Sequence, residues 1–343
     1  MHRTSPIPKK LFSMSFETKS KAERIFFREA IARAVSEEMI RDDRLVLIGQ
    51  DVGAFGGSYK EFVGLFDRFG PSRVRDTPVA EASMVGLGVG LAAAGMRAIV
   101  SVTYMDFLML GLDPLVNYAA KARFKTAGQI TAPLVVKTTS GARGQGVAHS
   151  QCIEAWLMAV PGLRVVSPSN PADAYGLMKS AIRSDGPVLY IDHKRLFPIA
   201  GELSDQSDAV PIGVAKTSRH GQHVTITAHS YMVRVALEAA ERLAATGISS
   251  EVIDLRSLSP LDIDAIVKSV ARTGALVTLE EGQLTCGIGA EIAYQVRERI
   301  DGVRIARVGA KAAPVSSNPI LESACLPDAV RLLESVKDVL NTR

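Results

Sequence analysis

The feature that most constrains the fold is an alternation of short apolar runs with segments of helical spacing, which occurs twice along the chain. In the first round we predict strands at residues 44–49, 97–103, 133–139, 163–168 and 187–192. The segments between them predict helices at residues 84–95, 106–125, 152–159 and 171–184. Near-continuous apolar strands separated by helices favour a parallel sheet that is covered on both faces.

A polar stretch with Pro and Gly at residues 198–212 is predicted to be a linker, after which the alternation restarts. Strands are predicted at 223–230, 249–255, 275–281 and 302–309, and helices at 231–246, 261–271, 288–299 and from Pro327 onward. The chain has 343 residues, and single cores rarely grow past roughly 250 residues. We therefore predict an α/β protein with two doubly wound domains, residues 20–200 and 210–343.

Charge, cysteines and hydropathy argue against several classes of protein. The net charge is +4 without a long basic run, so we expect neither nucleic acid nor a membrane as a partner. Three widely spaced cysteines without a CxxC pair predict reduced thiols rather than a disulfide framework or a zinc site. The apolar run at 84–100 contains glycines and Arg97, and it is shorter than the roughly 20 residues that a membrane span needs.

The amino-terminal segment lacks the apolar stretch of a secretory signal. Residues 1–16 are basic and contain Ser, so a mitochondrial presequence is the alternative. We expect a cytoplasmic protein, of bacterial origin, with the mitochondrial matrix as the second possibility.

Three side chains stand out as candidates for chemistry, and each also has a structural interpretation. Glu81 lies at the start of a Gly-rich apolar segment and is the only charged residue between Asp76 and Arg97. It is interpreted either as a favourable partner of a helix dipole or as a desolvated carboxylate that binds a proton readily. His149 lies in a Gly-rich loop, where it is either structural or an acid–base group. Phe107 is either core or a ligand contact.

The glycines that follow Glu81 do not make a dinucleotide-binding fingerprint. Gly86, Gly88 and Gly90 follow a turn rather than a strand, so we interpret them as positions where a helix packs closely on its neighbours. The sequence also lacks a P-loop, a GxSxG elbow and an HExxH pair, so it offers no obvious phosphate cradle.

Several motifs occur in succession that together resemble a known family. They are GQDVGAFGGSYK from residue 49, DTPVAEASMVGLGVGLAAAG from 76, DFLMLGLDPLVNYAAKARF from 106, HSQCIEAWLMAVPGLRVVSPSNPADAYGLMKSAIR from 149, EVIDLRSLSPLD from 251 and EEGQLTCGIGAEI from 280. Over residues 22–340 the chain resembles the beta subunit of the thiamine diphosphate-dependent decarboxylating component of 2-oxo acid dehydrogenase complexes, of the pyruvate, branched-chain or acetoin type. The resemblance implies a transketolase-like pyrimidine-binding domain followed by a transketolase C-terminal-type domain.

The resemblance also implies roles for individual residues. Glu81 matches the acid that hydrogen-bonds N1′ of the cofactor's aminopyrimidine ring, which assists proton removal from the thiazolium. Phe107 matches an aromatic residue that packs on the pyrimidine, and Thr103 falls in the same pocket. His149 matches a histidine that assists substrate binding and acyl transfer to a lipoyl group. A potassium ion is implied at backbone carbonyls, with the matching positions Leu134, Ala181, Ile182, Ser184 and Gly186.

The family places the magnesium and diphosphate ligands on a separate alpha subunit, and their motif is absent here. The resemblance therefore implies an α2β2 heterotetramer, a lipoyl acyltransferase core as a further partner, and a small 2-oxo acid or acetoin as the substrate. The chain departs from the family pattern at Gln50, Ala148 and Pro114 and in the segment 310–322, changes that bear on the substrate and leave Glu81 untouched.

Two other functions remain open at this point. A split transketolase-like enzyme would use the same acid to move a ketol unit. A non-catalytic relative could serve as an assembly scaffold, although the joint presence of Glu81, His149 and Phe107 argues against it.

Overall fold

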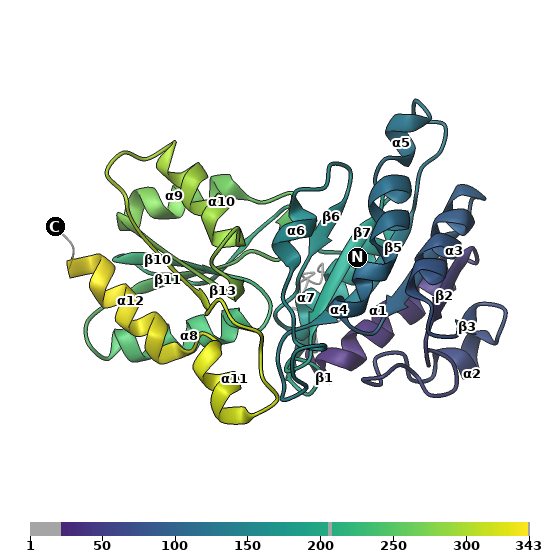
Figure 1. Cartoon of the computed structure of the whole chain (residues 1–343), viewed down its shortest axis with the longest axis horizontal. Helices are drawn as coiled ribbons and strands as arrows, with labels where there is room; N and C mark the ends of the chain where they lie inside the picture. The colour runs from purple at the N-terminus through teal and green to yellow at the C-terminus, as the bar shows by residue number, and fades with distance from the viewer. Residues whose placement is uncertain (1–21, 205–207, 342–343) are drawn as a thin grey trace, which may run out of the picture.

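Seven strands form the sheet of the first lobe in the order β12-β6-β7-β5-β4-β2-β3. The computed structural model describes residues 22–204 and 208–341, and Figure 1 shows them as two lobes, each with helices around a sheet. The neighbouring strands are parallel except for β12, which runs antiparallel to β6. The strands are β2 (Leu45–Gly49), β3 (Val74–Asp76), β4 (Arg97–Val102), β5 (Leu134–Ser140), β6 (Arg164–Val166), β7 (Val188–His193) and β12 (Ser257–Ser259).

The helices of the first lobe cover both faces of this sheet. They are α1 (Phe27–Arg41), α2 (Leu65–Phe69), α3 (Glu81–Ala93), α4 (Met105–Leu108), the short 3-10 turn η1 (Met109–Gly111), the π-helix η2 (Asp113–Ala119), α5 (Ala122–Lys125), α6 (Glu154–Met158) and α7 (Pro171–Arg183). A two-stranded antiparallel ribbon joins β1 (Ala22–Phe26) to β8 (Ala200–Ser204).

Alternate residues of the central strands enter two different cores, which explains their continuous apolar sequence. Leu45 and Leu47 of β2 pack with the helices α1 and α7, whereas Val46 and Ile48 pack with α3 and η2. Successive side chains of a strand point to opposite faces, so a strand buried on both sides needs apolar residues throughout. The predicted parallel sheet with two covered faces is confirmed.

The second lobe contains a five-stranded sheet in the order β14-β13-β10-β11-β9, with only β9 antiparallel to its neighbour. Figure 1 shows this sheet between the helices α9 and α10 on one side and α8 and α12 on the other. The elements of the second lobe are β9 (Lys216–Arg219), β10 (Val224–Ala228), α8 (Met232–Ala244), β11 (Ser250–Asp254), α9 (Ile263–Thr273), β13 (Ala275–Gln283), α10 (Ile288–Arg297), β14 (Arg304–Ala310), the short helix α11 (Pro319–Cys325) and α12 (Ala329–Asn341).

The two lobes share one apolar core and one sheet. Leu157 and Leu163 of the first lobe lie in the same buried cluster as Ile253, Ile266 and Val296 of the second. In addition, β12 follows the second lobe's β11 in sequence but pairs with β6 of the first sheet. Within the described ranges, every helix is too short or too polar to span a lipid bilayer.

Some predicted elements are wrong in detail. The predicted helix at 106–125 is four short pieces. Pro114, the second residue of the π-helix η2, has no N–H to continue the turn of η1 before it, which accounts for the break between η1 and η2. The predicted linker includes the strand β8, and helix α1 was not predicted at all. The possible presequence at 1–16, the domain ends at 20–21 and 342–343, and residues 205–207 of the linker lie outside the described residues.

Candidate active site

The candidate residues follow the carboxyl ends of the first sheet's strands. Glu81 comes after β3, Thr103 and Phe107 after β4, and His149 after β5. Because these strands are parallel, all four residues belong to loops or helix starts at one edge of the sheet. In the sheet, β3 lies on one side of β2, and β5 lies on the opposite side of β4. The strand order therefore reverses direction between β2 and β4, which is the topological switch point. Ligands of open α/β sheets bind outside the strand ends at such a point.

Glu81 is the first residue of α3, which begins three residues before the predicted helix at 84–95, and the residue is 7% exposed. Among the described residues, no group is hydrogen-bonded to its carboxylate. The helix start packs closely against η1, since a Cβ on Gly111 would lie 3.4 Å from the Glu81 carbonyl oxygen. The fully enclosed polar atoms that lack a partner do not include the Glu81 oxygens among the described residues. The carboxylate therefore keeps some access to solvent, and it is available to a group that the chain does not itself supply.

The packing of α3 explains only one of its three central glycines. A Cβ on Gly88 would approach a Val100 methyl group to 2.5 Å, so glycine is needed there for α3 to reach the sheet. Gly86 and Gly90 would meet no atom within 4 Å, so the predicted close packing is wrong for these two within the described chain. The segment is a helix with a preceding three-residue strand and a turn, and no nucleotide-binding loop forms.

Three aromatic side chains gather at the end of β4. The His149 imidazole lies edge-on to Tyr104, with ring centroids 4.8 Å apart, and edge-on to Phe107, with centroids 5.3 Å apart. Tyr59 stacks on Phe197 at 4.5 Å and contacts Tyr104 edge-on at 6.4 Å. The structure therefore brings Phe107 and His149 together, while no ring contact or hydrogen bond joins Glu81 to either of them within the described residues.

The base of the His149 loop is anchored from several sides. The carboxylate of Glu281, in the second lobe, accepts a hydrogen bond from the Ala142 N–H at 2.8 Å. Glu322 of α11 accepts one from the Gly144 N–H at 2.6 Å and pairs with Arg195 at 2.8 Å. The second lobe therefore fixes the start of the loop that carries His149.

There is no room for a side chain at Gly141, where the loop begins. Its φ is +85°, and a Cβ would lie 1.8 Å from Nε2 of His193. The close approach lets the His193 ring reach Glu281, whose Oε2 lies 2.9 Å from Nε2. The turn and the contact between His193 and Glu281 therefore depend on glycine at this position.

A buried charge cluster lies under the aromatic residues. Nζ of Lys137 lies 2.6 Å from Glu61 and 3.0 Å from Asp192, and all three side chains are buried. Burial raises the pKa of Asp192 to about 6, although the Lys137 charge opposes that rise. Burial alone would lower the pKa of Lys137, but the two carboxylates reverse the effect and raise it. The cluster ties the loop after β2 to the floor of the sheet.

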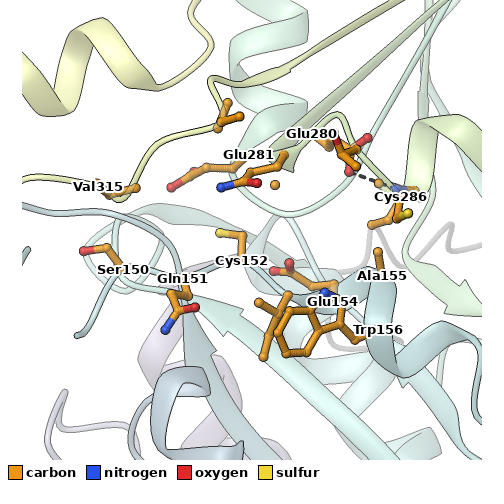
Figure 2. A pocket seen from close by; sticks show the side chains of 18 of the residues that line it. Ser150, Gln151, Cys152, Glu154, Ala155, Trp156, Glu280, Glu281, Cys286 and Val315 are labelled. Carbon is orange, nitrogen blue, oxygen red and sulfur yellow. Dashed lines mark hydrogen bonds between the residues drawn. The ribbon is translucent and has the colours of Figure 1, made fainter. Parts of the chain in front are cut away.

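A cavity of about 450 Å³ opens between the lobes directly after His149. Figure 2 shows the side chains of Cys152 and Glu154 on one side of it and those of Glu280 and Glu281 on the other. Glu280 caps α10 by accepting hydrogen bonds from the Ile288 and Gly289 N–H groups, each at 2.9 Å. Glu281 is hydrogen-bonded to His193 and to the Ala142 N–H. Glu154 has the fewest partners of the three carboxyl groups in the cavity, and burial raises its pKa to about 7.

Comparison with known proteins gives a consistent assignment. Residues 23–199 match the family model "Transketolase, pyrimidine binding domain", and residues 213–332 match "Transketolase, C-terminal domain". The chain is 46% identical over 282 residues to "Pyruvate dehydrogenase E1 component subunit beta-1, mitochondrial" of Oryza sativa subsp. japonica, covering 81% of this chain and 75% of that protein. It is 41% identical over 319 residues to "Pyruvate dehydrogenase E1 component subunit beta" of Rickettsia bellii, covering 92% and 98%.

The chain belongs to the family of 2-oxo acid dehydrogenase beta subunits. A solved structure titled "Split gene transketolase, inactive beta4 tetramer" has a TM-score of 0.78 at 24% identity and covers 92% of this chain and 98% of that one. At that identity the likeness concerns the fold alone.

The residues of this beta subunit fit the pyrimidine end of thiamine diphosphate. Glu81 is largely buried and its carboxylate has no donor among the described residues, and Phe107 offers a half-buried ring near the same sheet edge. Thr103 is half-buried at the end of β4. Across the residues that the structure describes, no three His, Cys, Asp or Glu side chains are grouped so that they could hold a metal ion.

The five positions implied for potassium lie together at the opposite end of the first sheet from Glu81. Leu134 begins β5, Ala181 and Ile182 are in the last turn of α7, and Ser184 and Gly186 follow it. The Arg97 guanidinium donates hydrogen bonds to the Ile182 carbonyl at 3.0 Å and to the Ser184 carbonyl at 2.8 Å. Two of the carbonyls thus already have a cationic partner.

Sequence reasoning missed Tyr104, Tyr59 and Lys194 as members of the site. Tyr104 comes directly after the predicted strand 97–103, and Lys194 comes two residues after the predicted strand 187–192, at the sheet edge where Thr103 lies. A search of every strand end for polar residues would have found these two. Tyr59 lies in an irregular loop, and its position depends on the long-range contact between Glu61 and Lys137.

Proposed function

We propose that this chain is the beta subunit of an acetyl-transferring, thiamine diphosphate-dependent 2-oxo acid dehydrogenase, and that it works with an alpha subunit in an α2β2 heterotetramer. The family assignment supports the beta-subunit function, and the relatives are named pyruvate dehydrogenase components. The observation that carries the proposal is Glu81, a largely buried residue at the topological switch point. Its carboxylate has no hydrogen-bond donor among the described residues and keeps some access to solvent.

The proposed roles follow from the position of each side chain. Thiamine diphosphate, when bound, supplies the nucleophilic carbon and the electron sink for decarboxylation. Glu81 would share a proton with N1′ of the pyrimidine ring, where a dry site strengthens the interaction. Phe107 and Thr103 would orient that ring from the end of β4. His149 would bind the substrate and move a proton during transfer of the acyl group to a lipoyl group.

The partners and ions belong to the same proposal. The alpha subunit would hold the diphosphate and its magnesium ion, and a lipoyl acyltransferase core would take up the acyl group. We also propose potassium at the carbonyls of Leu134, Ala181, Ile182, Ser184 and Gly186, where the ion would share two carbonyls with Arg97. The proposed location is the cytoplasm of a bacterium.

The proposal is tested by Glu81→Gln in the assembly with its alpha subunit, assayed for decarboxylation of pyruvate with an artificial electron acceptor. We expect kcat to fall by about 10²–10⁴-fold, because the amide cannot share the proton and acid–base steps contribute on this scale. Glu291→Gln is the matched control, since Glu291 also lies in the first turn of a helix but is exposed. A Glu81→Gln enzyme with nearly unchanged kcat would show that the assignment is wrong.

A further inference from the structure

Lys194, the residue after β7, is fully buried and contacts three groups around His149. Its Nζ donates a hydrogen bond to the backbone carbonyl of His149 itself and another, at 2.7 Å, to the carbonyl of Gly141. The same Nζ lies 5.0 Å from the centroid of the Tyr104 ring. One ammonium group thus joins the two ends of the 141–149 loop to the aromatic residue against which the imidazole packs.

The rest of the loop is held less firmly than these two ends. Gly144 and Gly146 have φ values of +75° and +77°, and Arg143, Gln145 and Val147 are exposed. Beyond the Gly144 N–H, the side-chain contact of the 145–148 stretch is Gln145, whose Nε2 donates to the Tyr104 hydroxyl at 3.3 Å. Removal of Lys194 would therefore free the His149 end of the loop while Glu281 and Glu322 still hold its start.

Stability alone gives a weak reason for a lysine at this position. Burial lowers the pKa of Lys194, and the charge of Asp106 opposes that effect. A buried ammonium costs desolvation energy that a packed apolar side chain would not. The ammonium group does orient the backbone, because its N–H donors bind two carbonyls that an apolar side chain could not bind.

We propose that Lys194 is a positioning residue that holds the imidazole of His149 against Tyr104 and Phe107 for the acyl-transfer step. The positioning part rests on the geometry, and the step it serves rests on the proposed function of His149. Lys194 then acts through His149 and has no separate contact with the reacting atoms.

The test uses Lys194→Met and Lys194→Arg in the complete alpha–beta assembly, with Lys179→Met as the control. Lys179 is also a buried lysine, but it is ion-paired, with Glu37 and Asp208, and it does not contact the 141–149 loop. Hydrogen exchange measured by mass spectrometry should rise in the 141–149 peptide for Lys194→Met only. The arginine variant keeps the charge and the donors, so it should retain most of the protection.

Activity is measured in two ways, as decarboxylation with an artificial acceptor and as the overall reaction with the lipoyl acyltransferase. We expect Lys194→Met to lower the overall rate by roughly 10–100-fold, since small misplacements of a catalytic group cost this much, and to lower decarboxylation less. On the background of His149→Ala, the same substitution should have little further effect, because interacting positions are not additive.

Unchanged exchange at 141–149, or rate losses that multiply in the double variant, would overturn the positioning role of Lys194. Raised exchange with equal losses in both assays would support the positioning role and overturn the acyl-transfer role proposed for His149. If Lys194→Met does not assemble, Lys194→Gln, which keeps one amide donor group on a shorter side chain, is measured in the same way.

Discussion

Glu154 shows how strongly the surroundings of a single residue set its chemistry. It begins the short helix α6 with only 3% of its surface exposed, and it borders the interdomain cavity beside Cys152. Burial raises its pKa from 4.5 to about 7, and the charges of Glu281 and Glu280 add to the rise. Glu281, equally buried, has its pKa lowered, because His193 and the Ala142 N–H outweigh the effect of burial. Partners therefore decide which of two buried carboxyl groups is ionised.

This difference predicts a pH dependence of stability. The folded-state pKa of Glu154 lies above the unfolded value, so folded protein binds the proton more tightly and stability falls as the pH rises from about 4.5 to about 7. Glu154→Gln cannot ionise, so we expect it to raise the stability of the assembly at pH 8 by about 1–3 kcal/mol and to change it little at pH 4.5. Thermal unfolding at the two pH values measures this. A stabilisation equal at both would contradict the ionisation argument.

At the scale of elements, the loop between β5 and α6 links the two lobes to the site. Its start is held by carboxylates of β13 and α11, and its end by the lysine that follows β7. The three glycines at 141, 144 and 146 all have positive φ, yet only Gly141 is also in steric contact with a ring. Backbone strain and steric contact can therefore be separated experimentally within one loop.

A pair of alanine substitutions tests this view of the loop. Gly141→Ala should force the His193 ring away from Glu281, because the added Cβ would lie 1.8 Å from Nε2. Gly144→Ala carries a similar penalty for its φ of +75° but meets no atom within 4 Å. We expect Gly141→Ala to lower the melting temperature and the overall rate clearly more than Gly144→Ala does. Equal effects would mean that backbone strain alone determines the outcome.

Local sequence patterns predicted many of the helices and strands, but they could not predict every strand pairing. The spacing of apolar runs predicted most strands and the long helices α3, α7 and α8, because burial on two faces leaves a local pattern. Helix α1 carries a helical pattern as well, with Phe27, Ile31, Val35 and Met39 buried, and could have been found. The pairing of β8 with β1 and of β12 with β6 could not, since these contacts join segments far apart in the chain.

The same distinction holds for the site. Glu81, Phe107 and His149 were selected by their sequence surroundings and by resemblance, and the structure brings two of them into ring contact. Tyr59 and Lys194 enter the site through contacts with Glu61, Lys137 and the loop carbonyls. Such contacts join the loops that follow β2, β5 and β7, three strands far apart in the chain. The strand-end position of Lys194 is visible in the sequence, but these contacts leave no short motif.

At the scale of the whole molecule, both lobes contribute contacts that hold the candidate residues at one edge of the first sheet. They share an apolar core, a strand of the first sheet, the hydrogen bond between His193 and Glu281 and the ion pair between Arg195 and Glu322. The described residues present a carboxylate, an aromatic ring and an imidazole at that edge, and no metal-binding cluster is found among them. On the proposed function, this chain supplies the pyrimidine and acyl-transfer side of a site that an alpha subunit completes.

The most direct test of that claim is a calorimetric titration of thiamine diphosphate with magnesium into the isolated chain and into the alpha–beta assembly. Circular dichroism first establishes that the isolated chain is folded. We predict tight binding to the assembly and binding to the folded isolated chain weaker by at least about 100-fold, a free-energy difference of roughly 2.7 kcal/mol. Tight, magnesium-dependent binding to the isolated chain would contradict the account, because the chain would then contain the whole cofactor site.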